Sequence, residues 1–437
     1  MADKRGTGTF VTDSTELTAS NLDIFSVPVT ENVLRSGFTV ELNPINALAD
    51  SGPFEFQLAR DPDHYTYLPL TRLQGTVRIV KAADSSDLTD ADTVSICNLF
   101  PHSLFKQIEI EVEGKQVNDI STSTYPIKAF IETVLTYGQD AKKTHLTLDG
   151  WEADEVGSEN KYTENDGWVK RKKRIIGKNY HFSMILHADF IQMERFLIPN
   201  TNINIKLIRN SDDYSMMSAT SIAKVEFKSL RLSVHKIRIA DEFNQAILAN
   251  LNKEVAIYPI TQSKIKTFLV QKGTKTTTIQ NILNGPLPQS IILGFLNAKS
   301  FNGDVTVNPF YFNNFGLNLL NLKINGKPFH PRPLQPNYAD EDYKREFRLL
   351  YDNTGIHHGN LTIDITEEEF VNNQCFYVFD FTPDLCNSFH LHLMGNGHID
   401  VELGFKSELE NNLYMIMYSA HHQTATIDNY RSTQIIE

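Results

Sequence analysis

The sequence predicts an all-β fold in which one sandwich-forming unit is used twice. The segment over residues 98–115 returns over residues 308–327 with the same features in the same order. Each copy has a strand with apolar residues at every second position, then a Gly-Lys turn, a loop and an amphipathic helix. Short alternating segments bounded by Asn, Pro, Gly and Asp dominate the remainder of the chain. The repeat is too long for a solenoid, so we expect two tandem domains of one fold.

The strand and turn are the clearest part of the repeated unit. Asn98-Leu99-Phe100 is echoed by Asn308-Pro309-Phe310, a short distance before each strand. Alternation buries one face of a strand, and a glycine allows the backbone to turn back after it. The alternating apolar residues and the turn residues are Ile108, Ile110, Val112 and Gly114-Lys115 in the first copy, and Leu320, Leu322, Ile324 and Gly326-Lys327 in the second.

A helix is predicted after each copy, and a third helix is predicted between them. Apolar residues three and four apart form one face of the first two helices, which end near Gly138 and Gly355. The third helix, over residues 241–252, begins with Asp241 as its cap and connects the two units. The apolar positions are Ile127, Phe130, Ile131, Val134 and Leu135 in the first helix, Tyr343, Phe347, Leu350 and Tyr351 in the second, and Phe243, Ala246, Ile247 and Leu251 in the third.

These elements divide the chain into four parts. Residues 1–24, rich in Thr, Ser and Asp, are predicted to form a flexible N-terminal arm. The first sandwich takes residues 25–240, the connecting helix 241–252 and the second sandwich 253–437. Strands at irregular spacing, joined by long loops that hold a helix, favour jelly-roll sandwiches over tight meanders. Strands are predicted near residues 38–42, 54–56, 73–80, 203–207, 225–239, 265–270, 291–295, 376–379, 389–393, 399–405 and 414–418, with alternation that slips inside 225–239 and so indicates bulges.

Two oppositely charged segments follow each other in the first unit. The loop over residues 151–168 is crowded with acidic residues and has few apolar ones, so we expect it to project into solvent. Five adjacent cations come next, and they repel one another unless they are solvated or paired. They can offset the acidic loop, act as a nuclear-import signal, or form a patch that faces packaged nucleic acid. These residues are Lys170, Arg171, Lys172, Lys173 and Arg174.

Composition limits the classes of function. The 437 residues carry a net charge of −12, which disfavours wrapping nucleic acid over the whole surface, so any contact with it has to be local. The N-terminus lacks an apolar signal core and no stretch is long enough to span a bilayer, which indicates a reducing compartment. We therefore expect the three cysteines, Cys97, Cys375 and Cys386, to be buried free thiols.

No signature of an enzyme is found, and no cofactor is expected. The chain lacks a complete phosphate-binding loop, a His-Glu-x-x-His motif and a Gly-x-Ser-x-Gly motif. His390 and His392 have the His-x-His spacing that jelly-roll enzymes of the cupin type use for a metal, and His398 follows shortly after. The Glu that such a site needs next is missing. An outer-face or subunit-contact position is therefore favoured over a metal site for these histidines.

Seven segments carry a resemblance to a known family. They are Asn21–Pro28, Asp50–Phe56, Asn98–Phe105, Tyr125–Gly138, Leu186–Phe190, Phe196–Asn200 and Ile205–Asn210. These segments resemble the major capsid proteins of adintoviruses and of Polinton (Maverick) elements. The likeness is dense over residues 21–240 and thinner afterwards.

The resemblance implies a double jelly roll, which is two tandem eight-stranded jelly-roll β-sandwiches with short helices in the loops. It also implies a homotrimer that closes into a pseudo-hexameric capsomer and builds an icosahedral shell around a double-stranded DNA genome. Such a protein belongs to the virion and is assembled inside the host cell, with the nucleus as a candidate site. Its partners are itself, neighbouring capsomers, penton and minor capsid proteins, and packaged DNA on the inner face.

Two other classes of function stay open at this point. Tandem β-sandwiches also serve as receptor- or carbohydrate-binding proteins of the spike or lectin type, which respond to glycans and form no shell. A jelly-roll metalloenzyme that uses His390, His392 and His398 is the second alternative, and metal analysis separates it from the others.

Overall fold

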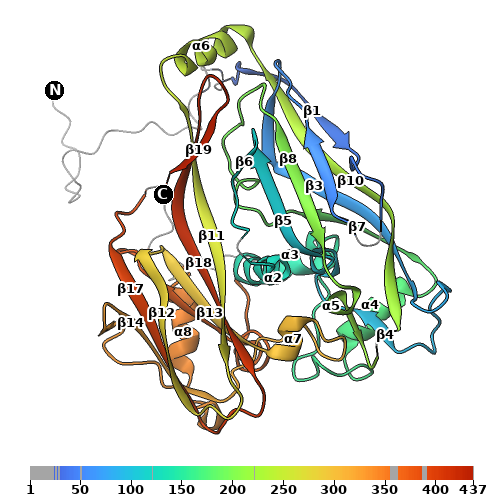
Figure 1. The fold of residues 1–437 in the computed structure, drawn as a ribbon, viewed down its shortest axis with the longest axis vertical. Coiled ribbons are helices and arrows are strands. Elements are labelled where there is room, and N and C mark those ends of the chain that lie inside the picture. Colours follow the sequence, from blue (N-terminus) through green and yellow to red (C-terminus); the bar gives the residue numbers. More distant parts are fainter. Residues whose placement is uncertain are drawn as a thin grey trace.

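Two β-sandwiches make up the protein, one formed by each half of the chain (Figure 1). The computed structural model describes residues 24, 27, 30–49, 52–120, 122–220, 222–354, 363–385 and 391–436. The predicted arm over residues 1–24 lies outside these residues except for Ile24. Cys386 and His390 also lie outside them.

The first sandwich packs two four-stranded antiparallel sheets face to face. Alternate residues of both sheets, such as Phe54, Val77 and Leu207, meet in one core. One sheet has the order β1 (Leu34–Leu42), β10 (Ala223–Ile239), β3 (Tyr65–Lys81), β7 (Asn179–Ile185), and the other has the order β2 (Phe54–Leu58), β8 (Ile203–Arg209), β5 (Phe105–Val112), β6 (Lys115–Gln116). A small additional pair is formed by β4 (Val94–Ile96) and β9 (Met216–Ser218).

The second sandwich repeats this arrangement. Its core joins residues of both sheets, such as Phe295 and Phe405, whose rings lie 6.3 Å apart. One sheet has the order β11 (Ala256–Val270), β18 (Leu413–Ile427), β13 (Ser290–Asn297), β16 (Phe376–Asp380), with β19 (Thr433–Ile436) also paired to β18. The other sheet has the order β12 (Thr276–Pro286), β17 (Asn396–Phe405), β14 (Leu317–Ile324), β15 (Lys327–Pro328).

The chain follows the same path through both sandwiches. When β4, β9 and β19 are set aside, each sandwich has eight strands, and numbering them along the chain gives the order 1-8-3-6 in one sheet and 2-7-4-5 in the other. This is the path of a jelly roll, in which strands distant in sequence pair across two facing sheets. The predicted fold of two eight-stranded jelly rolls is therefore confirmed.

The repeated segments take equivalent places in the two sandwiches. The first copy forms β5, the turn and β6, and the second forms β14, the turn and β15. At the turns, Glu113 and Gly114 have φ of 51° and 77°, and Asn325 and Gly326 have φ of 50° and 77°. Positive φ at both central residues is the geometry of a tight type I′ hairpin, which explains the glycine in each copy.

The three predicted helices are present as α2 (Tyr125–Thr136), α6 (Asp241–Leu251) and α8 (Lys344–Asp352). In α6 only Leu251 is buried, so its apolar face is only partly covered. No helix in the described residues is long and apolar enough to cross a membrane. The shorter helices are α1 (Phe100–Ser103), α3 (Gln139–Lys143), α4 (Asp166–Ile175), α5 (Asp212–Ser215), α7 (Ala298–Asn302) and α9 (Glu367–Asn372), with 3₁₀ turns at His145–Thr147 and Tyr338–Asp340.

Two predictions about strands have opposite outcomes. The slips expected in residues 225–239 are confirmed, because the pairing of β10 with β3 shifts register between Phe227 and Ser229 and again between Ser233 and His235. The strand predicted near residues 389–393 is wrong in its described part, since Leu391 and Leu393 are 60% and 100% exposed and β17 begins only at Asn396. The chain crosses there from one sheet to the other, so the apolar alternation has no core to face.

The prediction that residues 151–168 project into solvent is also wrong. Trp151 and Trp168, at the two ends of the segment, are buried, and so are Glu159 and Asn165 within it. Glu152 and Asp154 are paired with cations and an amide from elsewhere in the chain, as described below, whereas Glu155, Glu164 and Asp166 are exposed as predicted. Pairing removes the cost that would otherwise keep the first two carboxylates in water.

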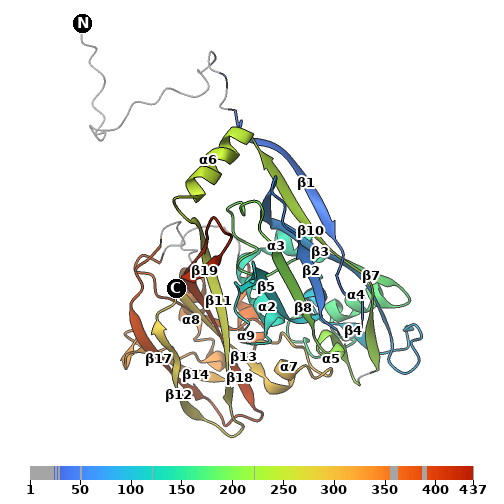
Figure 2. The same cartoon turned by 45° about the horizontal axis from the view of Figure 1, so that its top comes forward.

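The two cores exchange elements across the space between the sandwiches. α2 follows a hairpin of the first sandwich, yet its residues Ile127, Phe130 and Ile131 belong to the second core. In return, Tyr258 of β11 and Ile427 of β18 belong to the first core. Figures 1 and 2 show α2 between the sandwiches and the long strands β11 and β18 rising beside the first sandwich toward α6. The two halves are therefore packed as one body rather than as beads on a linker.

Candidate functional site at the junction of the two sandwiches

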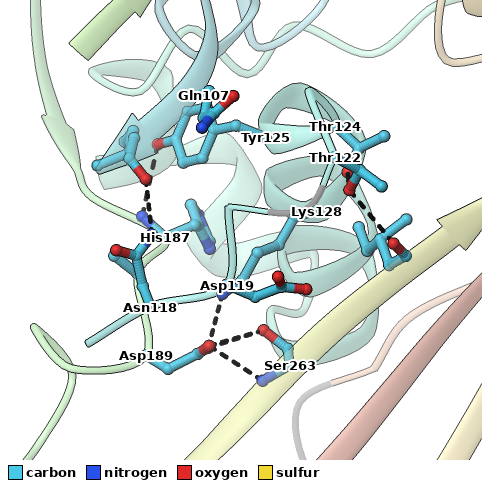
Figure 3. A pocket seen from close by; sticks show the side chains of 13 residues that line it. Gln107, Asn118, Asp119, Thr122, Thr124, Tyr125, Lys128, His187, Asp189 and Ser263 are labelled. Atoms are coloured by element: carbon cyan, nitrogen blue, oxygen red, sulfur yellow. Dashed lines mark hydrogen bonds and ion pairs between the residues drawn. The ribbon is translucent and has the colours of Figure 1, made fainter. Parts of the chain in front are cut away.

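A buried group of charges lies where α2 meets the second sandwich (Figure 3). Lys128 of α2 lies 2.6 Å from Asp189 and 3.5 Å from Glu132. Asp189 follows β7 in the first sandwich, so a single ammonium group joins a helix to the segment after a strand. All three side chains are largely withdrawn from solvent. Charges are retained in such places only when they are paired, and here one cation lies between two carboxylates.

The same carboxylates reach across to the second sandwich. Asp189 accepts hydrogen bonds from the backbone N–H of Ser263 at 3.0 Å and from its hydroxyl at 2.8 Å, and Ser263 belongs to β11. Glu132 accepts a hydrogen bond of 3.1 Å from the hydroxyl of Tyr418 in β18. Hydrogen bonds to charged acceptors are about twice as strong as neutral ones, so this group fixes the angle between the sandwiches.

Two buried imidazoles extend the charged group into the first sandwich. His187 Nδ1 lies 2.7 Å from Glu132, and the ring of His102 lies 5.1 Å from that of His187. His102 Nδ1 is 3.0 Å from the hydroxyl of Tyr125, and its Nε2 faces Asp149 at 3.8 Å. Burial lowers the pKa of His102 below its usual range, because a charged imidazole loses its water there.

The environment of α2 holds its charges in the ionised form. Burial by itself raises the pKa of Glu132, but the charge of Lys128 and the hydrogen bonds from His187 and Tyr418 outweigh burial and lower this pKa to about 2. Burial alone lowers the pKa of Lys128, yet the carboxylates of Asp189 and Glu132 prevail and raise it. A small cavity of about 40 Å³ adjoins the group, which is space for ordered water rather than for a substrate.

A second contact between the sandwiches is built around Arg171 of α4. Its guanidinium is 1% exposed, lies 2.5 Å from Asp154, and donates a hydrogen bond of 2.8 Å to the carbonyl of Ile96. The other oxygen of Asp154 accepts a hydrogen bond of 2.7 Å from Asn308 in the second half of the chain. Asp154 of the acidic segment thus neutralises Arg171 of the basic run and ties it to the other sandwich.

Aromatic rings close the space between the two polar contacts. Phe130 of α2 stacks on Phe310 with ring centres 4.8 Å apart and on Phe312 at 5.7 Å. The ring centre of Phe130 also lies 6.2 Å from that of Trp151. Stacked aromatic rings stabilise a core by more than the burial of their surface area alone.

The chain has been compared with known proteins by sequence and by structure. It matches no protein-family profile. An uncharacterised protein of Caenorhabditis elegans is 21% identical over 421 residues, which is 93% of this chain and 98% of that protein.

Among solved structures, the capsid protein VP54 of PBCV-1, fitted into a reconstruction of the virophage Sputnik, matches with a TM-score of 0.60 at 12% identity, over 94% of this chain and 98% of that one. A chain of the Sputnik virophage matches with a TM-score of 0.61 at 10% identity, over 97% of this chain and 93% of that one. The mavirus major capsid protein matches with a TM-score of 0.54 at 10% identity, over 98% and 96%. The chain has the double jelly-roll fold of these proteins.

Within this double jelly roll, the five predicted basic residues have different surroundings. Arg171 is buried as described, and Arg174 and Lys170 lie 2.6 Å and 3.9 Å from the carboxylate of Glu152. Lys172 donates to the carbonyl of Asp90 at 2.8 Å and lies over the ring of Trp168. Lys173 is exposed. One of the three predicted roles, balancing the charge of the acidic segment, therefore applies to three of the five cations, Lys170, Arg171 and Arg174.

Of the three predicted histidines, the structure describes His392 and His398, and these two face different carboxylates. His390 lies outside the described residues. His392 Nε2 lies 2.9 Å from Asp384, whereas His398 of β17 lies 3.7 Å from Asp400. Within the part of the chain that the structure describes, no three His, Cys, Asp or Glu residues are placed to hold a metal ion.

Two of the three predicted free thiols are confirmed, since Cys97 and Cys375 are buried and unbridged. Burial raises the pKa of both, to about 12 and about 11. A thiol so far from ionisation at neutral pH is a poor nucleophile, so these cysteines are packing residues.

The sequence patterns do not predict this junction. Lys128 and Glu132 are polar positions four residues apart on an amphipathic helix, and this spacing is also typical of an ordinary surface pair. The feature of the sequence that indicates the junction is the width of the apolar surface of α2. A helix that is apolar over most of its circumference is covered on more than one side.

Proposed function

We propose that this chain is a major capsid protein, three copies of which close into a pseudo-hexameric capsomer of an icosahedral shell around double-stranded DNA. The observation that carries the proposal is the match of the whole two-sandwich body, over 94–98% of the chain, to capsid proteins of PBCV-1 and mavirus and to a chain of the Sputnik virophage. Its role is structural and needs no catalytic residue.

The junction supports this role by physical argument. Three copies of a two-sandwich chain present six similar bodies around a threefold axis, so the trimer can fill a sixfold position in a shell. Tiling of this kind needs a constant angle between the two sandwiches of each chain. The exchange of core residues and the buried charges of Lys128, Glu132 and Asp189 supply that constancy.

Finer parts of the proposal rest on the sequence resemblance. They are the assignment to the adintovirus and Polinton (Maverick) type, the penton and minor capsid proteins as partners, the DNA on the inner face, and assembly in the host cell nucleus. Contact of residues 170–174 with nucleic acid or the import machinery belongs to this group. Any such contact is left to the exposed members of the run, because Arg171 is enclosed by protein.

The test is to measure the mass of the purified full-length chain by light scattering and to image it by negative stain. We expect trimers that appear as hexagonal blocks, and closed particles or sheets at higher concentration. A chain that stays monomeric at micromolar concentration contradicts the proposal. Binding to a glycan array without any assembly favours the receptor-binding alternative instead.

A further inference from the structure

A lysine, an aspartate and a glutamate are in contact at the junction of the two sandwiches. The nitrogen Nζ of Lys128 lies 2.6 Å from Oδ1 of Asp189 and 3.5 Å from Oε1 of Glu132. Figure 3 shows Lys128 and Ser263 reaching Asp189 from different directions. A hydrogen bond of this length holds the amine next to the carboxyl carbon, which is the position from which an amine attacks a carboxyl group to form an amide.

The fold favours an amide over the ion pair. In water both ions are strongly solvated, and this solvation keeps an ammonium and a carboxylate from condensing. The side chains of Lys128, Asp189 and Glu132 are only 13%, 8% and 14% exposed, so most of this solvation is lost at the junction. An amide carries no charge, and its formation therefore removes the cost of keeping two ions out of water.

Ser263 of β11 is placed to stabilise the charge that such an attack creates. Its backbone N–H donates to Oδ2 of Asp189 at 3.0 Å, and its hydroxyl lies 3.0 Å from the same atom. When the amine attacks, negative charge develops on the carboxylate oxygen that stays, and donors already directed at that oxygen act as an oxyanion hole. Lys128 contacts the other oxygen, Oδ1, which is therefore the one that leaves.

Proton transfer within the group supplies the neutral amine. Burial raises the pKa of Asp189 above its usual range, whereas the pKa of Glu132 is lowered to about 2. Asp189 is therefore the carboxylate that takes the proton of the ammonium, and Glu132 stays ionised beside the nitrogen as the acceptor of the next proton. The pKa of Lys128 is raised, so the neutral amine is the minor form, and we expect a slow reaction that occurs once in each folded chain.

We propose that Lys128 and Asp189 condense to an isopeptide bond, with Glu132 transferring a proton. The ammonium gives one proton to Oδ1 of Asp189, and the neutral nitrogen then attacks Cγ. Glu132 takes a second proton from the nitrogen and passes it to Oδ1, which leaves as water, while Oδ2 becomes the carbonyl oxygen of the amide. The small cavity of about 40 Å³ beside the group has room for the water that is released. No other reactant is consumed.

The bond ties the helix that the second core holds to the first sandwich. Lys128 lies on α2, whose residues Ile127 and Phe130 belong to the second core, and Asp189 lies in the segment after β7 of the first sandwich. The inference goes beyond the proposed function, because a shell can be built from chains in which the junction stays an ion pair.

Mass spectrometry of the full-length protein, denatured but otherwise intact, tests for the bond directly. We expect the mass to be lower than that of the unbonded chain by one water molecule. Trypsin should then fail to cut after Lys128, and one branched peptide should contain residues 116–142 and 179–195. A wild-type chain with the full mass and separate peptides overturns the proposal.

Two lysine variants locate the bond. Lys128→Arg keeps the positive charge but removes the amine, so this variant should have the full mass. Lys236→Arg is the matched control and should lose water as the wild type does. Lys236 is another buried lysine, 3.1 Å from the carboxylate of Asp61, but Asp61 is 27% exposed and has His64 beside it rather than a second carboxylate. A loss of water that persists in Lys128→Arg comes from another site and overturns the assignment. The branched peptide of the wild type decides the question even if Lys128→Arg fails to fold.

The role of Glu132 is tested by Glu132→Gln, which keeps the shape of the side chain but cannot carry the proton. We expect this variant to keep the full mass while its circular dichroism spectrum matches that of the wild type. If it loses water to the same extent as the wild type, Glu132 is not the group that transfers the proton.

Discussion

The helices α2 and α8 follow the same hairpin in two copies of one fold, yet α2 packs against the other sandwich and α8 against its own. Residues of α2, including Ile127, Phe130 and Ile131, are buried in the core of the other sandwich. α8 instead packs on β16 of its own sandwich through Leu350, while Arg348 faces solvent. A duplicated unit has thus kept its strand path and changed what its helix binds.

The difference follows from how the apolar residues are distributed around each helix. α8 is strongly one-sided, with charged residues over its exposed face, and it needs only one partner. In α2 eight of twelve residues are buried, and the polar ones, Lys128 and Glu132, are paired. A helix that is buried on most sides fixes two bodies to each other, whereas a one-sided helix is held by one body only.

The largest expected effect comes from removing a large apolar side chain from the face of α2 that packs against the second sandwich. Phe130→Ala removes a ring that is stacked on Phe310 and Phe312, and should lower the free energy of unfolding by about 3–5 kcal/mol. Phe347→Ala, at a half-buried position of α8, should cost clearly less. Urea unfolding of both variants measures the difference. Equal losses would mean that α2 is no more central to stability than α8.

The next effect separates the buried member of the basic run from its exposed neighbours. Asp154→Ala leaves the guanidinium of Arg171 buried without its carboxylate, which should cost about 3–5 kcal/mol. Removing both charges with Asp154→Ala and Arg171→Met should restore part of this loss. Lys170→Ala, which breaks only an exposed pair with Glu152, should cost about 0–1 kcal/mol. If the double variant is no more stable than Asp154→Ala, the loss does not come from an unpaired charge.

Acid should weaken the junction in two stages. The pKa of His102 is lowered in the folded protein, so the unfolded chain takes up this proton first and stability falls as the pH drops below about 6.5. The pKa of Glu132 is lowered from 4.5 to about 2, so its contribution is full above about 4.5 and is lost as the pH falls toward 2. Thermal unfolding from pH 7 to pH 3 measures both stages. In Glu132→Gln the dependence below pH 4.5 should become flatter, and an unchanged profile would exclude Glu132 as its source.

The smallest expected effect on stability concerns the exposed end of the basic run. Lys173→Ala should change the free energy of unfolding by less than about 0.5 kcal/mol. If this residue faces packaged DNA, the variant should bind duplex DNA more weakly, with the salt slope reduced by about 1. Fluorescence anisotropy at several salt concentrations measures both. Unchanged affinity and slope would leave charge balance as the explanation of the run.

Local patterns in the sequence predicted much of the fold. The alternation in β5 and β14 and the turns after them are set by neighbouring residues, and the sequence predicts both. The predicted cap of α6 is wrong, because Ala240 takes the N-cap position and Asp241 is the first helical residue, without a side-chain capping hydrogen bond. The strands β12 and β7 are not predicted by these patterns. β12 carries a run of threonines on a largely exposed edge, and β7 places polar residues between its apolar ones, so neither shows a strong apolar signal.

The site was harder to predict because its partners are far apart in sequence. The sequence predicts Asp154 to be part of a solvated acidic loop, because no neighbouring residue indicates its two partners. These partners are Arg171 and, from the other half of the chain, Asn308. Ser263 and Tyr418 are unremarkable in their own strands. Composition and periodicity describe one element at a time, whereas a junction depends on which elements meet.

The exchange of core residues bears on how the protein is made. Synthesis proceeds from the N-terminus, and β18, which adds Ala425 and Ile427 to the first core, leaves the ribosome after all the other strands of that core. Until then α2 and the neighbouring part of the first core keep their apolar surfaces open, a state prone to aggregation. A truncated polypeptide would stay in that state, so cells that produce this protein in quantity would need chaperones to shield the unfinished chain.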